Sequence, residues 1–160
     1  MNPIRALVVA VIVLLAAGCG VSPDGPAPAG DAPTGVSPDV TLYFVDHQGQ
    51  LRPDRRATGR LGSVAEAVSL LLASPAGSGL HSEIEQLTVT SVTAKTGPGV
   101  VELILPLAHY EVTRRGIDQI VCTALGVHVQ GGGQRTTKVR LRFTVGTEEP
   151  APPRSCPLIK

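Results

Sequence analysis

The sequence has few aromatic residues and no excess of charge of either sign. Trp is absent, and Tyr and Phe occur twice each among 160 residues. Proteins that bind nucleic acids stack bases on aromatic rings and gather Lys and Arg on one face. Here 14 Lys and Arg stand against 13 Asp and Glu, which gives a formal net charge of +1. The composition therefore argues against a nucleic-acid partner.

The sequence also lacks an apolar run long enough to cross a bilayer. Its longest such segment, 6–17, has about a dozen residues, whereas a transmembrane helix needs about 20. Arg5 precedes this segment, and Leu15-Ala16-Ala17-Gly18-Cys19 ends it. A basic start, a short apolar core and small residues before the cleavage site are typical of a secretory signal peptide. We therefore predict a signal peptide over residues 1–18.

The cysteine at the end of this segment is a possible site of lipid attachment. Ala-Ala-Gly-Cys resembles the lipobox of bacterial lipoproteins, in which the Cys thiol receives a diacylglyceryl group and becomes the first residue of the mature chain. Two acyl chains suffice for stable anchoring, because each buried CH2 contributes about 0.8 kcal/mol. The resemblance implies lipidation at Cys19 and a protein held at the outer face of the cell membrane. Plain secretion with a coincidental Cys is the alternative.

Residues 19–39 are predicted to form a Pro/Gly-rich linker. The prolines are Pro23, Pro26, Pro28, Pro33 and Pro38, too closely spaced for a helix or a sheet. Such segments favour extended polyproline II, which rises about 3.1 Å per residue, so about 20 residues span up to roughly 60 Å.

Only two cysteines remain if Cys19 carries lipid. Cys122 and Cys156 then lie in a compartment that permits oxidation, where a disulfide is the default. Closing a loop of about 35 residues stabilises a fold by roughly 4 kcal/mol on the chain-entropy model. The alternative is a pair of unpaired or reactive thiols.

The first half of the remaining sequence predicts two strands and a helix. Residues 40–45 are β-branched and aromatic, 46–49 have turn chemistry, and a short second strand follows at 51–53. Ser63 and Glu66 form a capping box before an apolar helical face that Ser74-Pro75 ends.

The second half predicts a hairpin, a helix and a final strand. Residues 87–94 and 100–105 flank a Gly/Pro turn, and Pro106 is expected to end the second of these strands. Thr113 is expected to cap a helix that ends near Gly126, and 138–145 alternates apolar and polar residues. These elements predict an α+β domain over 40–146, with a mostly antiparallel sheet and two helices on one face, followed by a tail at 147–160.

The sequence offers little catalytic chemistry. The four histidines are scattered, at 47, 81, 109 and 128, without the spacing of a helical metal pair, and no Gly-x-Ser-x-Gly motif occurs. We therefore expect no catalytic residue, no metal and no cofactor. Residues His81 to Glu85 place several potential ligands close together, so a small extracytoplasmic enzyme or ligand carrier that uses this loop is the alternative.

Two basic clusters are candidate binding surfaces. Lys138, Arg140 and Arg142 form a stripe on the polar face of the last predicted strand. Such a row protects a strand edge and keeps it solvated, or it binds an anionic partner, either an envelope protein or a cell-wall polymer. The second cluster consists of Arg52, Arg55, Arg56 and Arg60, and the same two interpretations apply to it.

Several segments of the predicted domain carry a family resemblance. They are Val40 to Asp46 with Gly49 and Leu51, Leu70 to Pro75, Gly79 to Ser82, Gly99 to Leu103, and Ile117 to Leu125. In order and spacing they resemble the GerMN domain family of sporulation and spore-germination proteins. The resemblance implies an extracytoplasmic protein, often a lipoprotein, whose domain is similar in architecture to ring-building domains of spore-envelope assemblies. It implies no catalytic residue.

Overall fold

An antiparallel hairpin opens the described part of the chain. In the computed structural model, β1 (Asp39–Asp46) pairs with β2 (Leu51–Ala57). Asp46 closes the turn, because its Oδ1 accepts the N–H groups of Gln48 and Gln50, each at 2.9 Å. The structure describes residues 38–145 and 151–160. The predicted signal peptide 1–18, Cys19 and the linker up to residue 37 lie outside the described residues.

The second strand is longer than the short strand predicted at 51–53. Pro53 lies opposite Tyr43, whose backbone N–H and C=O are bonded to helix side chains and therefore point away from β2. At such a position the missing N–H of proline costs no ladder bond. The strand can therefore continue through Pro53.

The first helix begins and ends where the sequence predicts. In α2 (Val64–Ala73), the Ser63 Oγ accepts the Glu66 N–H at 3.2 Å, and the Glu66 carboxylate accepts the Ser63 N–H at 2.7 Å. The buried side chains Ala67, Val68, Leu71 and Leu72 lie at helical spacing. The predicted capping box and apolar face are thus confirmed.

The hairpin in the second half of the domain is confirmed, with different limits. Its strands are β4 (Thr93–Gly97) and β5 (Val100–Ala108), so the first overlaps the predicted 87–94 only at its last two residues and continues to Gly97. The expectation that Pro106 ends the second strand is wrong. A register shift lies between Leu105 and Ala108, and such an irregularity accommodates a proline inside a strand.

The last strand pairs parallel to β5. A short 3-10 turn, η1 (His109–Glu111), and α3 (Arg114–Gln130) connect β5 to β6 (Lys138–Val145). Thr113 caps α3 as predicted, its Oγ1 accepting the Gly116 N–H at 3.1 Å. The helix does not end near Gly126 but continues for another turn.

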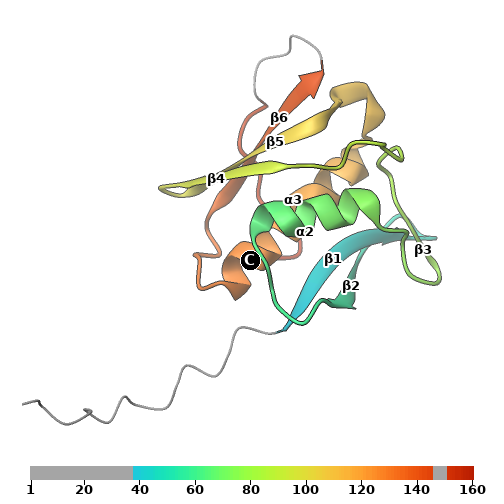
Figure 1. Ribbon diagram of the computed structural model, residues 1–160, viewed down its shortest axis with the longest axis horizontal. Helices are drawn as coiled ribbons and strands as arrows, with labels where there is room; N and C mark the ends of the chain where they lie inside the picture. Colours follow the sequence, from blue (N-terminus) through green and yellow to red (C-terminus); the bar gives the residue numbers. More distant parts are fainter. Residues whose placement is uncertain (1–37, 146–150) are drawn as a thin grey trace, which may run out of the picture. The chain divides into compact units, whose positions relative to one another are not determined.

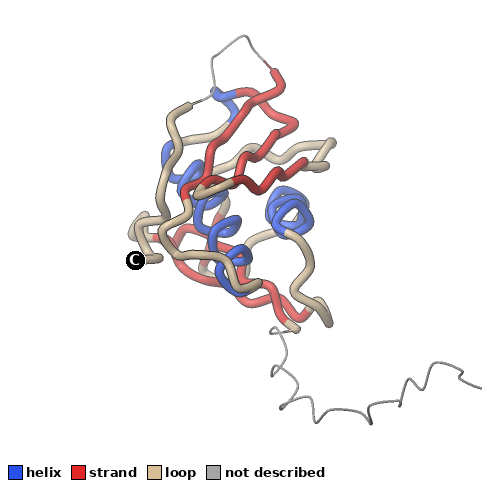
Figure 2. Tube along the Cα trace, turned by 90° about the vertical axis from the view of Figure 1, so that its left-hand side faces the viewer, coloured by secondary structure: helices blue, strands red, loops and turns tan. Residues whose placement is uncertain are grey.

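The fold is α+β, but its strands form two sheets instead of one. Their strand orders are β2-β1-β3, where β3 is Leu80–His81, and β4-β5-β6. Figures 1 and 2 show the helices lying between these sheets. The predicted arrangement of two helices on one face of a single sheet is therefore wrong. The physical reason is α3, whose buried residues are distributed around most of its circumference, as expected of a helix covered on two sides.

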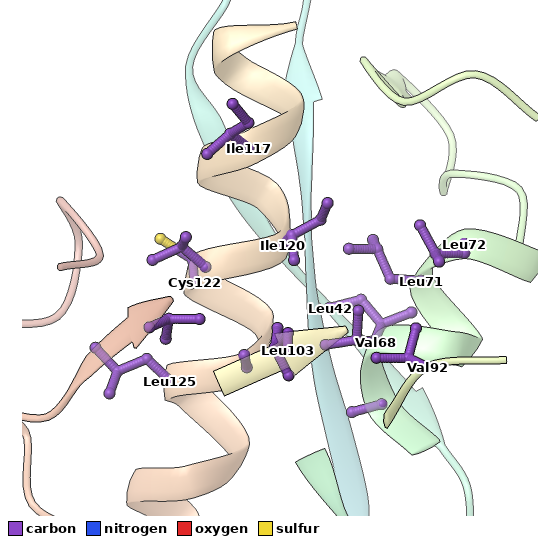
Figure 3. Packing of buried hydrophobic residues seen from close by; sticks show 14 of the residues in the cluster. Leu42, Val68, Leu71, Leu72, Val92, Leu103, Ile117, Ile120, Cys122 and Leu125 are labelled. Atoms are coloured by element: carbon purple, nitrogen blue, oxygen red, sulfur yellow. The ribbon is translucent and has the colours of Figure 1, made fainter. Parts of the chain in front are cut away.

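The core joins all three layers. In Figure 3, Leu42 of β1, Val68 of α2, Ile120 of α3 and Leu103 of β5 converge between the sheets. Each of these four side chains is fully buried.

Polar side chains of α3 close the open edge of β1. Gln119 Nε2 donates to the Tyr43 carbonyl at 3.1 Å, and the Tyr43 N–H donates to Thr123 Oγ1 at 3.1 Å. Gln119 Oε1 also accepts the N–H of Glu83 at 2.8 Å. Both Gln119 and Thr123 are buried, so these bonds satisfy backbone groups that water cannot reach.

Residues 151–160, the described part of the predicted tail at 147–160, pack against the domain. Val139 of β6 and Arg154 exchange two backbone hydrogen bonds of 2.8 Å. Cys156 lies at disulfide distance from Cys122 of α3, with the sulfurs 2.00 Å and the Cα atoms 4.8 Å apart. We call residues 151–160 the C-terminal strap, because they link β6 to α3.

Candidate interaction surface

The outer face of the β4–β5–β6 sheet carries an uneven distribution of charge. Val101, Leu103 and Leu105 are fully buried, so the alternate residues of β5 face outward. Strand pairing places the charged residues on this outer side. They are Lys95, Glu102, Lys138, Arg140 and Arg142. We call them the basic sheet face; four cations against one carboxylate give it a formal charge of +3.

The predicted stripe on β6 is part of this surface. Lys138 and Arg142 are exposed, and Arg140 is partly exposed. The predicted alternation of β6 holds for Val139 and Leu141, which are buried, but Val145 is 51% exposed.

Glu102 stands at the centre of the basic sheet face. Its carboxylate lies 3.9 Å from Arg140 Nη1 and 3.4 Å from Arg142 Nη1. Within the described residues, no other carboxylate lies within 4.0 Å of these two guanidinium groups. One negative charge therefore orients two cations without neutralising them both.

Sequence reasoning missed Lys95 and Glu102. The signal for this pair was present, because a two-residue turn at Pro98-Gly99 fixes the register that sets Lys95 opposite Glu102. The approach of Glu102 to Arg140 and Arg142 depends instead on the parallel pairing of β5 with β6, which the sequence analysis did not predict.

The second basic cluster is largely neutralised. Its ion pairs are Arg52–Asp46 at 2.7 Å, Arg55–Asp39 at 3.4 Å, Arg56–Asp54 at 2.7 Å and Arg60–Glu66 at 2.6 Å. The hydrogen bond from Arg52, followed by that from the Gln50 N–H, lowers the pKa of Asp46. The hydrogen bonds from the Ser63 N–H and then from Arg60 lower the pKa of Glu66 to about 2. Each of these four arginines therefore has a carboxylate partner within the domain.

The loop from His81 to Glu85 is also engaged in internal contacts. Thr113 Oγ1 donates to the Glu83 carboxylate at 2.6 Å, and His81 Nε2 lies 3.5 Å from the same carboxylate. Ser82 Oγ accepts the Ile84 N–H at 3.2 Å, and Ile84 forms a backbone bridge with Val112. An open hollow of about 400 Å³ lies between this loop and residues 110–113.

The other histidines lie apart from this loop. His109 packs edge-on against Phe143, with ring centroids 5.3 Å apart, and His128 Nε2 lies 3.2 Å from Thr137 Oγ1. In the described ranges, no group of three or more His, Cys, Asp and Glu side chains is placed to hold a metal ion. No helix within these ranges is long and apolar enough to span a membrane.

Comparison of the chain with protein-family models, with curated proteins and with solved structures finds no match.

Proposed function

We propose that this protein is a membrane-anchored extracytoplasmic lipoprotein whose noncatalytic, GerMN-like domain binds an anionic partner in the cell envelope. The signal segment and its terminal Cys19 support the anchor. The order of two strands, helix, hairpin, helix and strand is consistent with the GerMN resemblance. The observation that carries the binding role is the basic sheet face, which has four cations and a single carboxylate on paired strands.

The contrast between the two basic clusters supports the location of the binding surface. The arginines of the Arg52–Arg60 cluster have carboxylate partners, whereas Lys95 and Lys138 have none within 4.0 Å in the described part of the chain. Cations held on a sheet without internal partners are available to steer and bind an anion.

The anchor is tested by cell fractionation of a Cys19→Ser variant. Wild-type protein is expected in the membrane fraction with a diacylglyceryl mass on Cys19, and the variant is expected as unprocessed precursor. Membrane-bound, processed Cys19→Ser protein would contradict lipidation.

The binding surface is tested by photo-crosslinking in intact cells. A crosslinking residue at Thr93, exposed on the outer side of β4, is compared with one at Gln48, exposed in the β1–β2 turn. Adducts identified by mass spectrometry are expected from position 93 and not from 48. Adducts confined to position 48 would refute this location.

The rival hypothesis of an enzyme or ligand carrier is tested at the His81–Glu85 loop. His81 is exposed, so His81→Ala should leave the fold intact. We expect this variant to retain the wild-type pattern of crosslinked partners. Loss of that pattern, with unchanged thermal unfolding, would favour the rival.

A further inference from the structure

A shallow depression lies within the basic sheet face, near the β4–β5 turn. Its volume is about 360 Å³, and Lys95, Val100, Glu102 and Arg140 line it together with residues 96–98. This volume falls within the range of about 300–1,000 Å³ found for small-molecule sites. Lys95 and Arg140 are the register partners of Glu102 on its two neighbouring strands. The Lys95 ammonium and the Arg140 guanidinium therefore both line this depression.

The contacts of Glu102 leave most of the donors of both arginines unused. A guanidinium carries five N–H donors in a planar fork, and Glu102 approaches only Nη1 of Arg140 and Nη1 of Arg142. A fork of this kind binds the oxygens of phosphate groups in a bidentate manner. The single charge of Glu102 therefore leaves these two guanidinium groups with a net positive charge toward an anion.

The cations also form a row. Lys138, Arg140 and Arg142 alternate along β6, so their Cα atoms recur about every 6.6 Å. A ligand that matches this row presents several anionic groups in succession. A single small anion would use only the depression.

The fold disfavours a peptide that would add as a strand to the edge of β6. The C-terminal strap already occupies the edge of β6 at Val139, which hinders addition of a peptide strand there.

The chemistry of the face also indicates which part of a polymer it recognises. The outward-facing residues of β4, β5 and β6 include no Phe, Tyr or Trp, and thus no ring on which a sugar stacks. We propose that the basic sheet face binds the phosphodiester groups of an anionic cell-wall polymer, with Lys95 and Arg140 supplying cations to one group from either side of Glu102. This inference deepens the proposed function and rests on its extracytoplasmic location.

The test is a binding titration of the full mature chain in nonionic detergent with poly(glycerol phosphate) of defined length. Affinity is expected to fall linearly with salt on a log-log plot. Lys95→Gln/Arg140→Gln should weaken binding at least about tenfold and reduce the slope by about 2. The matched control Arg114→Gln/Arg115→Gln removes the same charge from exposed positions on α3 and should change affinity less than about twofold. Equal losses in the two variants would overturn the proposal.

A third variant tests whether the cations of the basic sheet face bind the polymer or only stabilise the sheet. Glu102→Gln removes the only carboxylate of the basic sheet face and should tighten polymer binding by about two- to fivefold. Unchanged or weaker binding of a folded Glu102→Gln protein would count against the site.

Two further ligands test the assigned chemistry. Poly-glutamate of equal charge is expected to bind at least about tenfold more weakly than poly(glycerol phosphate), and equal or tighter binding would replace the polymer by a peptide. Because the acyl chains insert into any bilayer, binding to vesicles that contain phosphatidylglycerol is compared between the wild type and Lys95→Gln/Arg140→Gln, which should bind equally well. Weaker vesicle binding of the variant would replace the polymer by a membrane.

The outcomes also distinguish this inference from the proposed function. A protein adduct at Thr93 in cells, without binding to poly(glycerol phosphate), overturns the polymer and leaves the binding domain in place. A soluble cytosolic protein overturns the proposed function, whatever the titration yields.

Discussion

The two sheets are equal in strand number but differ in how their charges are arranged. In β2-β1-β3, three Arg and three Asp give no formal net charge. In β4-β5-β6, four cations share a single Glu. In the first sheet Arg52, Asp54 and Arg56 lie opposite the buried Phe44, Leu42 and Val40, so part of this difference follows from burial, which requires that charges be paired. Internal ion pairs neutralise the charged residues of the first sheet. The second sheet keeps an excess of positive charge, which an external anion would neutralise.

The sheets also differ in how their edges are finished. Buried Gln119 and Thr123 of α3 close the edge of β1, whereas the backbone of the C-terminal strap closes β6 at Val139. The first edge depends on side chains within the core, and the second on a segment held by Cys156. The second sheet is therefore expected to be the more sensitive to loss of a covalent bond.

Removal of the cysteine pair should have the largest effect. Cys122→Ala/Cys156→Ala opens a link with a sequence separation of 34. The free energy of unfolding should fall by about 4 kcal/mol, measured by chemical denaturation. Hydrogen exchange should accelerate more at the Val139 amide than at the Tyr43 amide, because release of the strap adds a local opening at Val139 to the global loss of stability. A loss below about 1 kcal/mol, or equal acceleration at both amides, would remove this distinction between the sheets.

The next largest effect is expected at the edge of β1. Gln119→Leu keeps most of the side-chain volume but leaves the Tyr43 carbonyl and the Glu83 N–H unsatisfied. Thermal and chemical unfolding should show a loss of about 2–4 kcal/mol. The same substitution at exposed Gln130, at the end of the same helix, should change stability by less than about 0.5 kcal/mol. Similar values for the two variants would show that α3 does not close this edge.

Local signals in the sequence predicted most of the elements, because each depends on neighbouring residues. The Ser63–Glu66 capping box, the Thr113 cap and the turn at Pro98-Gly99 are examples. The division into two sheets depends on contacts distant in sequence and was missed. The available signal for parallel pairing of β5 and β6 was the order strand, helix, strand. Neighbouring parallel strands are joined by a crossover connection, which is usually a helix.

The same distinction explains the outcome for the candidate sites. Alternation along one strand was enough to place Lys138, Arg140 and Arg142 on a polar face. The difference between this stripe and the Arg52–Arg60 cluster depends on which carboxylates fold beside each group. Glu102 belongs to another strand, so the centre of the basic sheet face was not evident from β6 alone.

The smallest expected effect compares one substitution on the two sheets. Arg56 donates Nη2 to Asp54 and to the Pro75 carbonyl, each at 2.7 Å, and its guanidinium carbon lies 5.9 Å from the centre of the Phe44 ring. Arg142 is half exposed and has only Glu102 as an ion-pair partner among the described residues. Arg56→Gln should therefore reduce stability by about 1–2 kcal/mol, and Arg142→Gln by about 0–0.5 kcal/mol, in chemical denaturation.

Binding to poly(glycerol phosphate) should show the opposite order for these two variants. Arg142→Gln removes a cation from the row on β6, so it should weaken binding, whereas folded Arg56→Gln should bind as the wild type does. This reversal is the sharpest form of the contrast between the sheets, because stability and binding change at different residues. If Arg142→Gln lowers stability as much as Arg56→Gln does and leaves polymer binding unchanged, the cations of the second sheet serve the fold, as those of the first do.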